Sequence, residues 1–184
     1  MIMLTNAAPF HDFGDKAFAV NASPIHAAAI CRLVAFWADR GLTIRRGLRE
    51  VITNIDDFVV AMHRQRAVGC GALEAVSGEV GEIRSIAVAE HAARVGAGRA
   101  VVDALVAKAH ARGMSEVVLL TKTPEFFGRL GFEAIGHEQL PAVFTGMIAQ
   151  QPGRTLTGKV AMRRVLAPAP AAEVVVPAAV TARV

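Results

Sequence analysis

The chain of 184 residues contains no tyrosine and only two cysteines. It also has no uninterrupted apolar run of the roughly 18 residues that would span a membrane. Without tyrosine, no phenol can act as a general acid or stack on a base. Cys31 and Cys70 form neither a disulfide framework nor a CxxC metal pair, so we expect reduced thiols and a cytoplasmic protein. No basic segment followed by an apolar one opens the chain, so no signal peptide is expected.

The formal net charge is +4, with an isoelectric point near 9.7. This mild excess of positive charge suits an anionic small molecule as well as it suits nucleic acid. The basic residues are spread along the chain without interleaved aromatic residues, so nucleic acid is not the expected partner. The histidines show no HxH or HExxH spacing, and GxSxG is absent. We therefore expect neither a metal site nor a serine hydrolase.

The length favours one domain with a core of its own. Residues 1–15 are predicted to be a loose leader, residues 16–166 the working domain, and residues 167–184 an extended tail rich in Ala, Pro and Val. An alternative is that the tail lies across a neighbouring subunit, which leaves a homodimer possible.

Hydrophobic periodicity within residues 16–166 alternates between strands and helices. A segment rich in polar turn residues is expected before the last strand. The pattern predicts an α/β fold in which helices flank a mixed, mostly antiparallel central sheet, rather than a doubly wound one. The predicted strands are 16–21, 58–63, 67–76, 82–89, 117–120, a short one after 132, and 159–165; the predicted helices are 24–39, one ending at Gly113, and 125–130.

A glycine loop precedes the second long helix, in the segment Arg94-Val95-Gly96-Ala97-Gly98-Arg99-Ala100. Glycines let the backbone approach a ligand, and a helix N-terminus favours a phosphate or pyrophosphate. The loop lies in mid-chain, and its third glycine position is Val101. It is therefore not a Rossmann fingerprint, and the GxxxxGK[ST] phosphate loop is also absent.

Four motifs in order resemble those of the GCN5-related N-acetyltransferase (GNAT) superfamily: Gly69–Leu73, Gly81–Val88, Gly96–Ala100 and Leu119–Phe132. Within the superfamily, the chain is most similar to the acetyltransferase domain of N-acetylglutamate synthases. That subfamily carries an Arg-Arg pair followed by an Ile-Asp-x-Phe segment, as do Arg45-Arg46 and Ile55–Phe58 here. Its Arg-x-Ser-Lys-like stretch before the last strand is replaced by Thr155–Lys159, with Arg154 displaced.

The resemblance implies the GNAT fold and acetyl-CoA as a co-substrate, with no metal. It implies that main-chain groups of Ile86, Ala87 and Val88 align the pantetheine arm and stabilise the thioester oxyanion. Many relatives place a tyrosine acid where Phe127 stands. The residues expected to contact coenzyme A are Ile86, Ala87, Val88, Arg94, Val95, Gly96, Ala97, Gly98, Arg99, Ala100, Phe126, Phe127 and Arg129.

An α-ammonium group must lose a proton before it attacks, so a base is required. Glu82 stands where the family places it, with Glu79 as the second choice. Either Thr121 or Thr123 relays a proton to the departing thiolate, or the thiolate leaves as an anion. Alternation along a strand would place residues 82, 84 and 86 on one face. The residues expected to hold a substrate carboxylate are Arg45, Arg46, Arg84 and Lys122.

The expected activity is acetylation of the α-amino group of an amino acid, with glutamate and arginine biosynthesis as the specific prediction, by direct attack in a ternary complex. Two alternatives stay open. One is acetylation of another small amine or a toxic amino-acid analogue, because Thr121–Phe127 is loosely similar to arsenic-resistance acetyltransferases. The other is a non-catalytic acyl-CoA sensor, because the phenolic acid is absent.

Overall fold

A computed structural model describes residues 15–151 and 153–167. Two of the predicted segments, the leader and the tail, lie almost wholly outside these ranges. The strands are β1 (Phe18–Asn21), β2 (Phe58–His63), β3 (Arg66–Ala75), β4 (Val80–Val88), β5 (Glu116–Thr121), β6 (Glu133–Ile135) and β7 (Val160–Val165). The helices are α1 (Ala27–Ala38), α2 (Leu48–Thr53), α3 (Ala97–Ala111), α4 (Pro124–Gly128) and α5 (Ala142–Gln150), with short 3₁₀ turns at Pro24–His26, Ile55–Asp57, Glu90–Ala92 and His137–Gln139.

The strands form a single seven-stranded sheet in the order β1-β2-β3-β4-β5-β7-β6. Every neighbouring pair is antiparallel except β4 and β5, which are parallel because α3 connects them as a crossover. The predicted fold class, a mixed and mostly antiparallel sheet flanked by helices, is confirmed.

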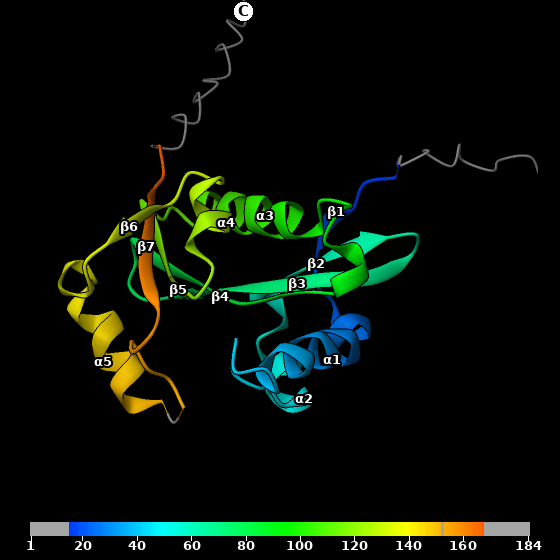
Figure 1. The fold of residues 1–184 in the computed structure, drawn as a ribbon, viewed down its shortest axis with the longest axis horizontal. Coiled ribbons are helices and arrows are strands. Elements are labelled where there is room, and N and C mark those ends of the chain that lie inside the picture. The colour runs from blue at the N-terminus through cyan, green and yellow to red at the C-terminus, as the bar shows by residue number, and fades with distance from the viewer. Residues whose placement is uncertain (1–14, 152, 168–184) are drawn as a thin grey trace, which may run out of the picture.

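Helices cover both faces of the sheet (Figure 1). α3 and α4 lie on one face, where alternate residues of the strands join Val101, Leu105 and Phe127 in the largest core cluster. α1 and α2 cover the other face beside β2 and β3, and α5 covers it beside β5 and β7. α5 stands apart from α1 and α2. The charged side chains of β3 and β4 lie on the part of this face that neither group of helices covers.

The helix α5 contradicts the expectation of a turn-rich polar segment before the last strand. Its sequence AVFTGMIAQ is short and contains Gly146 and β-branched residues, which are weak helix formers. Packing stabilises it instead, since Phe144 and Ile148 face the core four residues apart and are 0% and 5% exposed. None of the helices within residues 15–151 and 153–167 is long and apolar enough to cross a membrane.

Candidate active site

The candidate site lies where the two parallel strands separate. β4 and β5 pair only from Val80 opposite Glu116 to Glu82 opposite Val118. Beyond this point β4 continues to Val88, whose carbonyl accepts a hydrogen bond from Trp37 Nε1 at 2.8 Å, while β5 stays paired with β7. The divergence opens a cleft of about 780 Å³. It is lined by the second half of β4, the end of β5, the start of α3, α4 and the loops 42–46 and 154–159.

A β-bulge reorients the second half of β4. Ser85 has a φ of +55°, and the register with β3 shifts between Cys70 and Ala72. Glu82 and Arg84 therefore face the side of α1 and α5, whereas Ile86 lies against α3 with Ile83. The expectation that residue 86 shares a face with 82 and 84 is wrong, because the extra residue inverts the alternation. Because of the bulge, β4 carries charged side chains at alternate positions before Ser85 and packs Ile86 against α3 after it.

Glu82 lies at the point where the strands part and is 3% exposed. Its Oε1 accepts a hydrogen bond from Nη2 of Arg154, and its Oε2 is buried without a hydrogen-bond partner among the described residues. Burial raises the pKa of this carboxyl above its ordinary value, although the charges of Arg154, Arg46 and Lys159 oppose the rise. A buried carboxylate with a raised pKa and one free oxygen is suited to accept a proton.

Arg46 and Arg84 surround Glu82 from two different elements. Arg84 pairs with Glu74 on β3, and its Nη1 lies 3.9 Å from Glu82 Oε2. Arg46 comes from the loop before α2, pairs with Glu50 and donates from Nε to Ser85 Oγ at 3.3 Å. Both predicted arginines line the cleft.

Arg45 lies differently from its neighbour in the sequence. It pairs with Asp39, and its side chain is 61% exposed. It contributes to a smaller, polar cavity of about 360 Å³ that continues from the main cleft past Arg46, Arg84 and Arg154 toward α2. The predicted Arg-Arg pair is thus split, with only one member beside Glu82.

Two lysines add positive charge to the same region. Lys122 follows β5 and donates to the carbonyl of Gly41 at 3.0 Å, which fixes the loop after α1 across the cleft. Lys159 precedes β7, and its pKa is lowered by burial and by the charges of Arg154 and Lys122. Neither lysine has a carboxylate partner in an ion pair among the described residues.

The opposite end of the cleft is formed largely by backbone. Gly96 precedes α3 with a φ of +80°, a conformation that favours glycine, and the first turn of α3 follows directly. At Gly98 a Cβ atom would lie 3.0 Å from Cζ of Phe126, so glycine permits the close approach of α3 and α4. Such a concave helix N-terminus is suited to a phosphate group.

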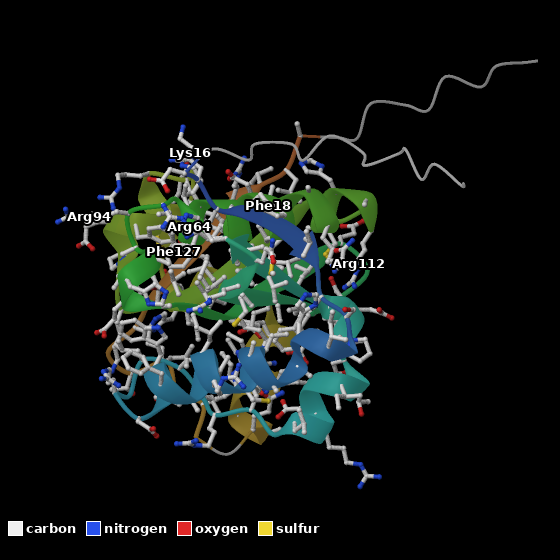
Figure 2. All side chains as sticks on the ribbon, turned by 90° about the vertical axis from the view of Figure 1, so that its right-hand side faces the viewer. Lys16, Phe18, Arg64, Arg94, Arg112 and Phe127 are labelled. Carbon is white, nitrogen blue, oxygen red and sulfur yellow. The ribbon has the colours of Figure 1, made fainter. Side chains whose placement is uncertain are left out.

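The structure brings most of the predicted coenzyme residues to this end of the cleft. Those lining it are Ile86, Ala87, Val88, Gly96, Gly98, Arg99, Phe126, Phe127 and Arg129. Val95, Ala97 and Ala100 do not line it: Ala97 is buried in the core and Val95 packs against it. Arg94 is exposed and projects from the edge of the molecule, whereas Phe127 lies within it (Figure 2).

Thr121 and Thr123 line the cleft at the end of β5. Oγ1 of Thr121 accepts the backbone N–H of Thr123 at 2.9 Å and lies 3.2 Å from its hydroxyl. Because a hydroxyl can accept and donate at once, the proton of Thr121 stays available. Phe127 is 6% exposed and stacks edge-on with Phe126 and Phe132, so it packs the cleft wall and donates no proton.

Sequence reasoning missed two charged residues of the site, Arg154 and Lys159. Both belong to the segment between α5 and β7, 72 and 77 residues after Glu82 in the chain. No spacing rule connects residues so distant, although a displaced arginine before the last strand had been noted. Within the described residues, no group of three or more His, Cys, Asp or Glu side chains could hold a metal ion.

Residues 54–134 match a family model described as an acetyltransferase (GNAT) domain. An uncharacterized N-acetyltransferase from Chlorobaculum tepidum is 32% identical over 146 residues, covering 79% of this chain and 94% of the relative. An amino-acid acetyltransferase from Mycobacterium tuberculosis is 36% identical over 110 residues, which cover 58% of this chain and 63% of the relative. This chain thus matches just under two thirds of that relative's length.

Two solved structures resemble the chain throughout the described domain. One, from Mycobacterium tuberculosis in complex with CoA and NLQ, has a TM-score of 0.72 at 29% identity and covers 81% of this chain and 99% of its own. The other is the N-acetylglutamate synthase from Neisseria gonorrhoeae complexed with coenzyme A and N-acetyl-glutamate. Its TM-score is 0.73 at 24% identity, covering 82% of this chain and 35% of its own, a likeness of fold.

Proposed function

The chain belongs to the GNAT family of N-acetyltransferases, which use acetyl-CoA, and on this premise we propose that it acetylates the α-amino group of an amino acid, with glutamate as the acceptor. The acetyltransferase domain of the proposal spans residues 16–166. Its proposed setting is arginine biosynthesis in the cytoplasm.

One observation carries the proposal: a buried carboxylate, Glu82, stands among cations at the point where the strands diverge. Arg154 and Arg84 pair with it, and the charges of Arg46 and Lys159 also act on it. An amino acid with a second carboxylate offers one ammonium group and two anions. The ammonium group complements Glu82, and the carboxylates complement the surrounding guanidinium and ammonium groups.

The similar proteins agree with this assignment of substrate class. A relative at 36% identity is named an amino-acid acetyltransferase. The solved structure at 29% identity holds CoA and NLQ together, as two molecules in one complex. The name supports an amino acid as the acceptor class, and the joint presence of CoA and a second small molecule supports a ternary complex.

In the proposed mechanism, Glu82 takes one proton from the α-ammonium group and becomes neutral. The amine lone pair then attacks the thioester carbonyl, so that a C–N bond forms while the C–O double bond opens to an oxyanion. Backbone N–H groups in the bulged half of β4 stabilise this oxyanion. Its collapse breaks the C–S bond, and the thiolate leaves with the electron pair.

The acylated nitrogen still carries one proton too many, and the thiolate needs one proton to become a thiol. The hydroxyl of Thr121 is proposed to relay a proton from the nitrogen to the sulfur: the N–H of Thr123 uses one of its two lone pairs, which leaves the second to accept a proton while the hydroxyl donates its own. The proton on Glu82 returns to solvent. Overall, the ammonium group and the thioester give an amide, a thiol and one released proton.

A thiol-release assay with acetyl-CoA and a panel of amines tests the proposal. We expect turnover on glutamate to exceed that on simple alkylamines and on uncharged amino acids. Equal turnover on simple amines would contradict the amino-acid assignment and favour acetylation of another small amine. Coenzyme binding without turnover on any amine would instead identify a sensor.

A further inference from the structure

The ion pair between Arg154 and Glu82 has an unusual place for a buried pair. Their side chains are 6% and 4% exposed, and they come from positions far apart in the chain. Glu82 is fixed, because its backbone pairs with both β3 and β5. Arg154 belongs instead to the irregular segment before β7. One partner is therefore held by the sheet and the other by a loop.

The supports of Arg154 are weak ones. Its Nη1 donates to Oε1 of Gln151 at 3.1 Å, and its guanidinium lies 5.6 Å from the ring centre of Phe144. A neighbouring side-chain amide and an aromatic face allow the guanidinium to turn without breaking secondary structure. Arg154 also lines both cavities, so it borders the space on either side of Glu82.

The groups that face Glu82 come from every element around it. Arg84 on β4 is matched by Glu74, which lies opposite Glu82 on β3. Arg46 is matched by Glu50 on α2. Lys159 before β7 and Lys122 after β5 complete the set.

Arg154 differs from these cations in its partner. Arg154 donates a hydrogen bond to the proposed base itself, whereas Arg46 pairs with Glu50, and Arg84 pairs with Glu74 and stays 3.9 Å from Glu82. A carboxylate bound to a guanidinium is held in its charged form and is a weaker base. The ion pair with Arg154 thus lowers the basicity of Glu82.

We propose that Arg154 is a positioning residue that exchanges partners, leaving Glu82 for a carboxylate of the incoming acceptor. The exchange rests on the proposed function, because it requires an acceptor that carries a carboxylate. Without the acceptor, the ion pair neutralises the buried charges of Arg154 and Glu82. After binding, Arg154 neutralises the ligand, and Glu82 regains its full basicity beside the ammonium group. An amine without a carboxylate would leave the base restrained.

The test follows the carboxyl of Glu82 by isotope-edited infrared titration, with and without N-acetylglutamate as the probe in the presence of CoA. Glu82→Gln identifies the band. In the wild-type protein we expect the ligand to raise the pKa of Glu82 by about one unit or more, since a nearby opposite charge lowers a carboxyl pKa by 1–3 units. The wild-type measurement needs no variant that might fail to fold.

Arg154→Met separates exchange from the ligand's own negative charge. In this variant the pKa without ligand is already raised, so the ligand-induced shift shrinks to less than half. Arg154→Lys should keep an intermediate shift, and the exposed Arg49→Met should match the wild type. A full ligand-induced pKa shift in Arg154→Met would overturn the exchange but not the proposed function. The same holds if the ligand binds to the wild type without shifting the pKa of Glu82. If N-acetylglutamate does not bind, the proposed glutamate site falls and the exchange falls with it.

Discussion

The two ends of the cleft are built in different ways. The proposed coenzyme end consists mainly of backbone and apolar side chains, from the bulged half of β4, Gly96, Gly98 and Phe126, with Arg99 and Arg129 beside them. The proposed acceptor end consists of charged side chains from segments far apart in the chain, among them the buried pair of Glu82 and Arg154. In the proposed function, the first end is a surface for one invariant ligand, and the second is a set of charges for selecting among amines. Changes at the acceptor end should therefore impair chemistry and selectivity, and changes at the coenzyme end should impair affinity.

The largest effect is expected at the acceptor end, from Glu82→Gln. Loss of the base should lower kcat by about 100-fold or more, the usual contribution of general base catalysis. The affinity for CoA should stay within about twofold, since the amide is nearly isosteric. Steady-state thiol release and calorimetry measure the two quantities.

The matched control is Glu79→Gln. Glu79 was the second choice for the base, but it lies exposed in the turn before β4 and does not line the cleft. It should leave kcat within about twofold, because exposed substitutions away from a site have little effect. A large loss in Glu79→Gln would show that the charged end has been assigned wrongly.

The next effect separates Arg46 from Arg45. Arg46→Met should raise KM for glutamate by about tenfold or more, because hydrogen bonds to charged groups contribute about 1.5–3 kcal/mol. Arg45→Met should change KM by no more than about twofold, since an exposed ion pair contributes little. Equal effects of the two substitutions would contradict the assignment of Arg46 alone to the cleft.

A substitution at the coenzyme end should show the opposite signature. In Gly98→Leu the new side chain meets Phe126, so we expect the Kd for CoA to rise by about tenfold, in line with an overpacking cost of about 1–3 kcal/mol. Gly78→Leu is the matched control, because a Cβ there has nothing within 4 Å. If Gly98→Leu instead left CoA affinity intact and raised KM for glutamate, the two ends would be interchanged.

The smallest effect is expected from Thr121→Val, where the ends meet. A thiolate is a tolerable leaving group, so removing the relay should lower kcat by only about three- to tenfold. Thr123→Val should have a smaller effect still, because its backbone N–H, which is retained, supports Thr121. If Thr121→Val lowered kcat as much as Glu82→Gln does, proton delivery to sulfur would be rate-limiting, contrary to this account.

Most residues predicted to contact coenzyme A line one end of the cleft, because the segments that form this end are local in the chain. Gly96, Gly98 and the strand before them lie close together in the chain, and their chemistry is a matter of backbone. The acceptor end was predicted only in part. Glu82, Arg46, Arg84 and Lys122 were among the predicted site residues and line the cleft, whereas Arg154 and Lys159 reach it through the pairing of β5 with β7.

Two local features also escaped prediction. The bulge at Ser85 reverses which residues of β4 face α3. The sequence gives no sign of it, since a positive φ is uncommon for serine. The helix α5 is stabilised by the burial of Phe144 and Ile148 rather than by its own propensities. Both features result from tertiary packing, which cannot be read from the hydrophobic periodicity of the sequence.

The missing tyrosine takes on a specific meaning at this site. Phe127 stands where the family resemblance places the usual phenolic acid, and it is buried in the cleft wall. In the proposed mechanism, proton delivery to sulfur therefore depends on Thr121 or on solvent, and Glu82 remains the main proton-transfer group.

The pH dependence of kcat/KM for glutamate, in wild type and in Glu82→Gln, tests the central claim most directly. Burial raises the pKa of Glu82 above its ordinary value. In the proposed mechanism the ionised carboxylate is the base. Wild-type kcat/KM should thus fall as the pH drops through that raised pKa, and Glu82→Gln should lose this acidic limb together with its rate. Near-normal turnover of Glu82→Gln across the pH range, with the limb retained, would contradict the account.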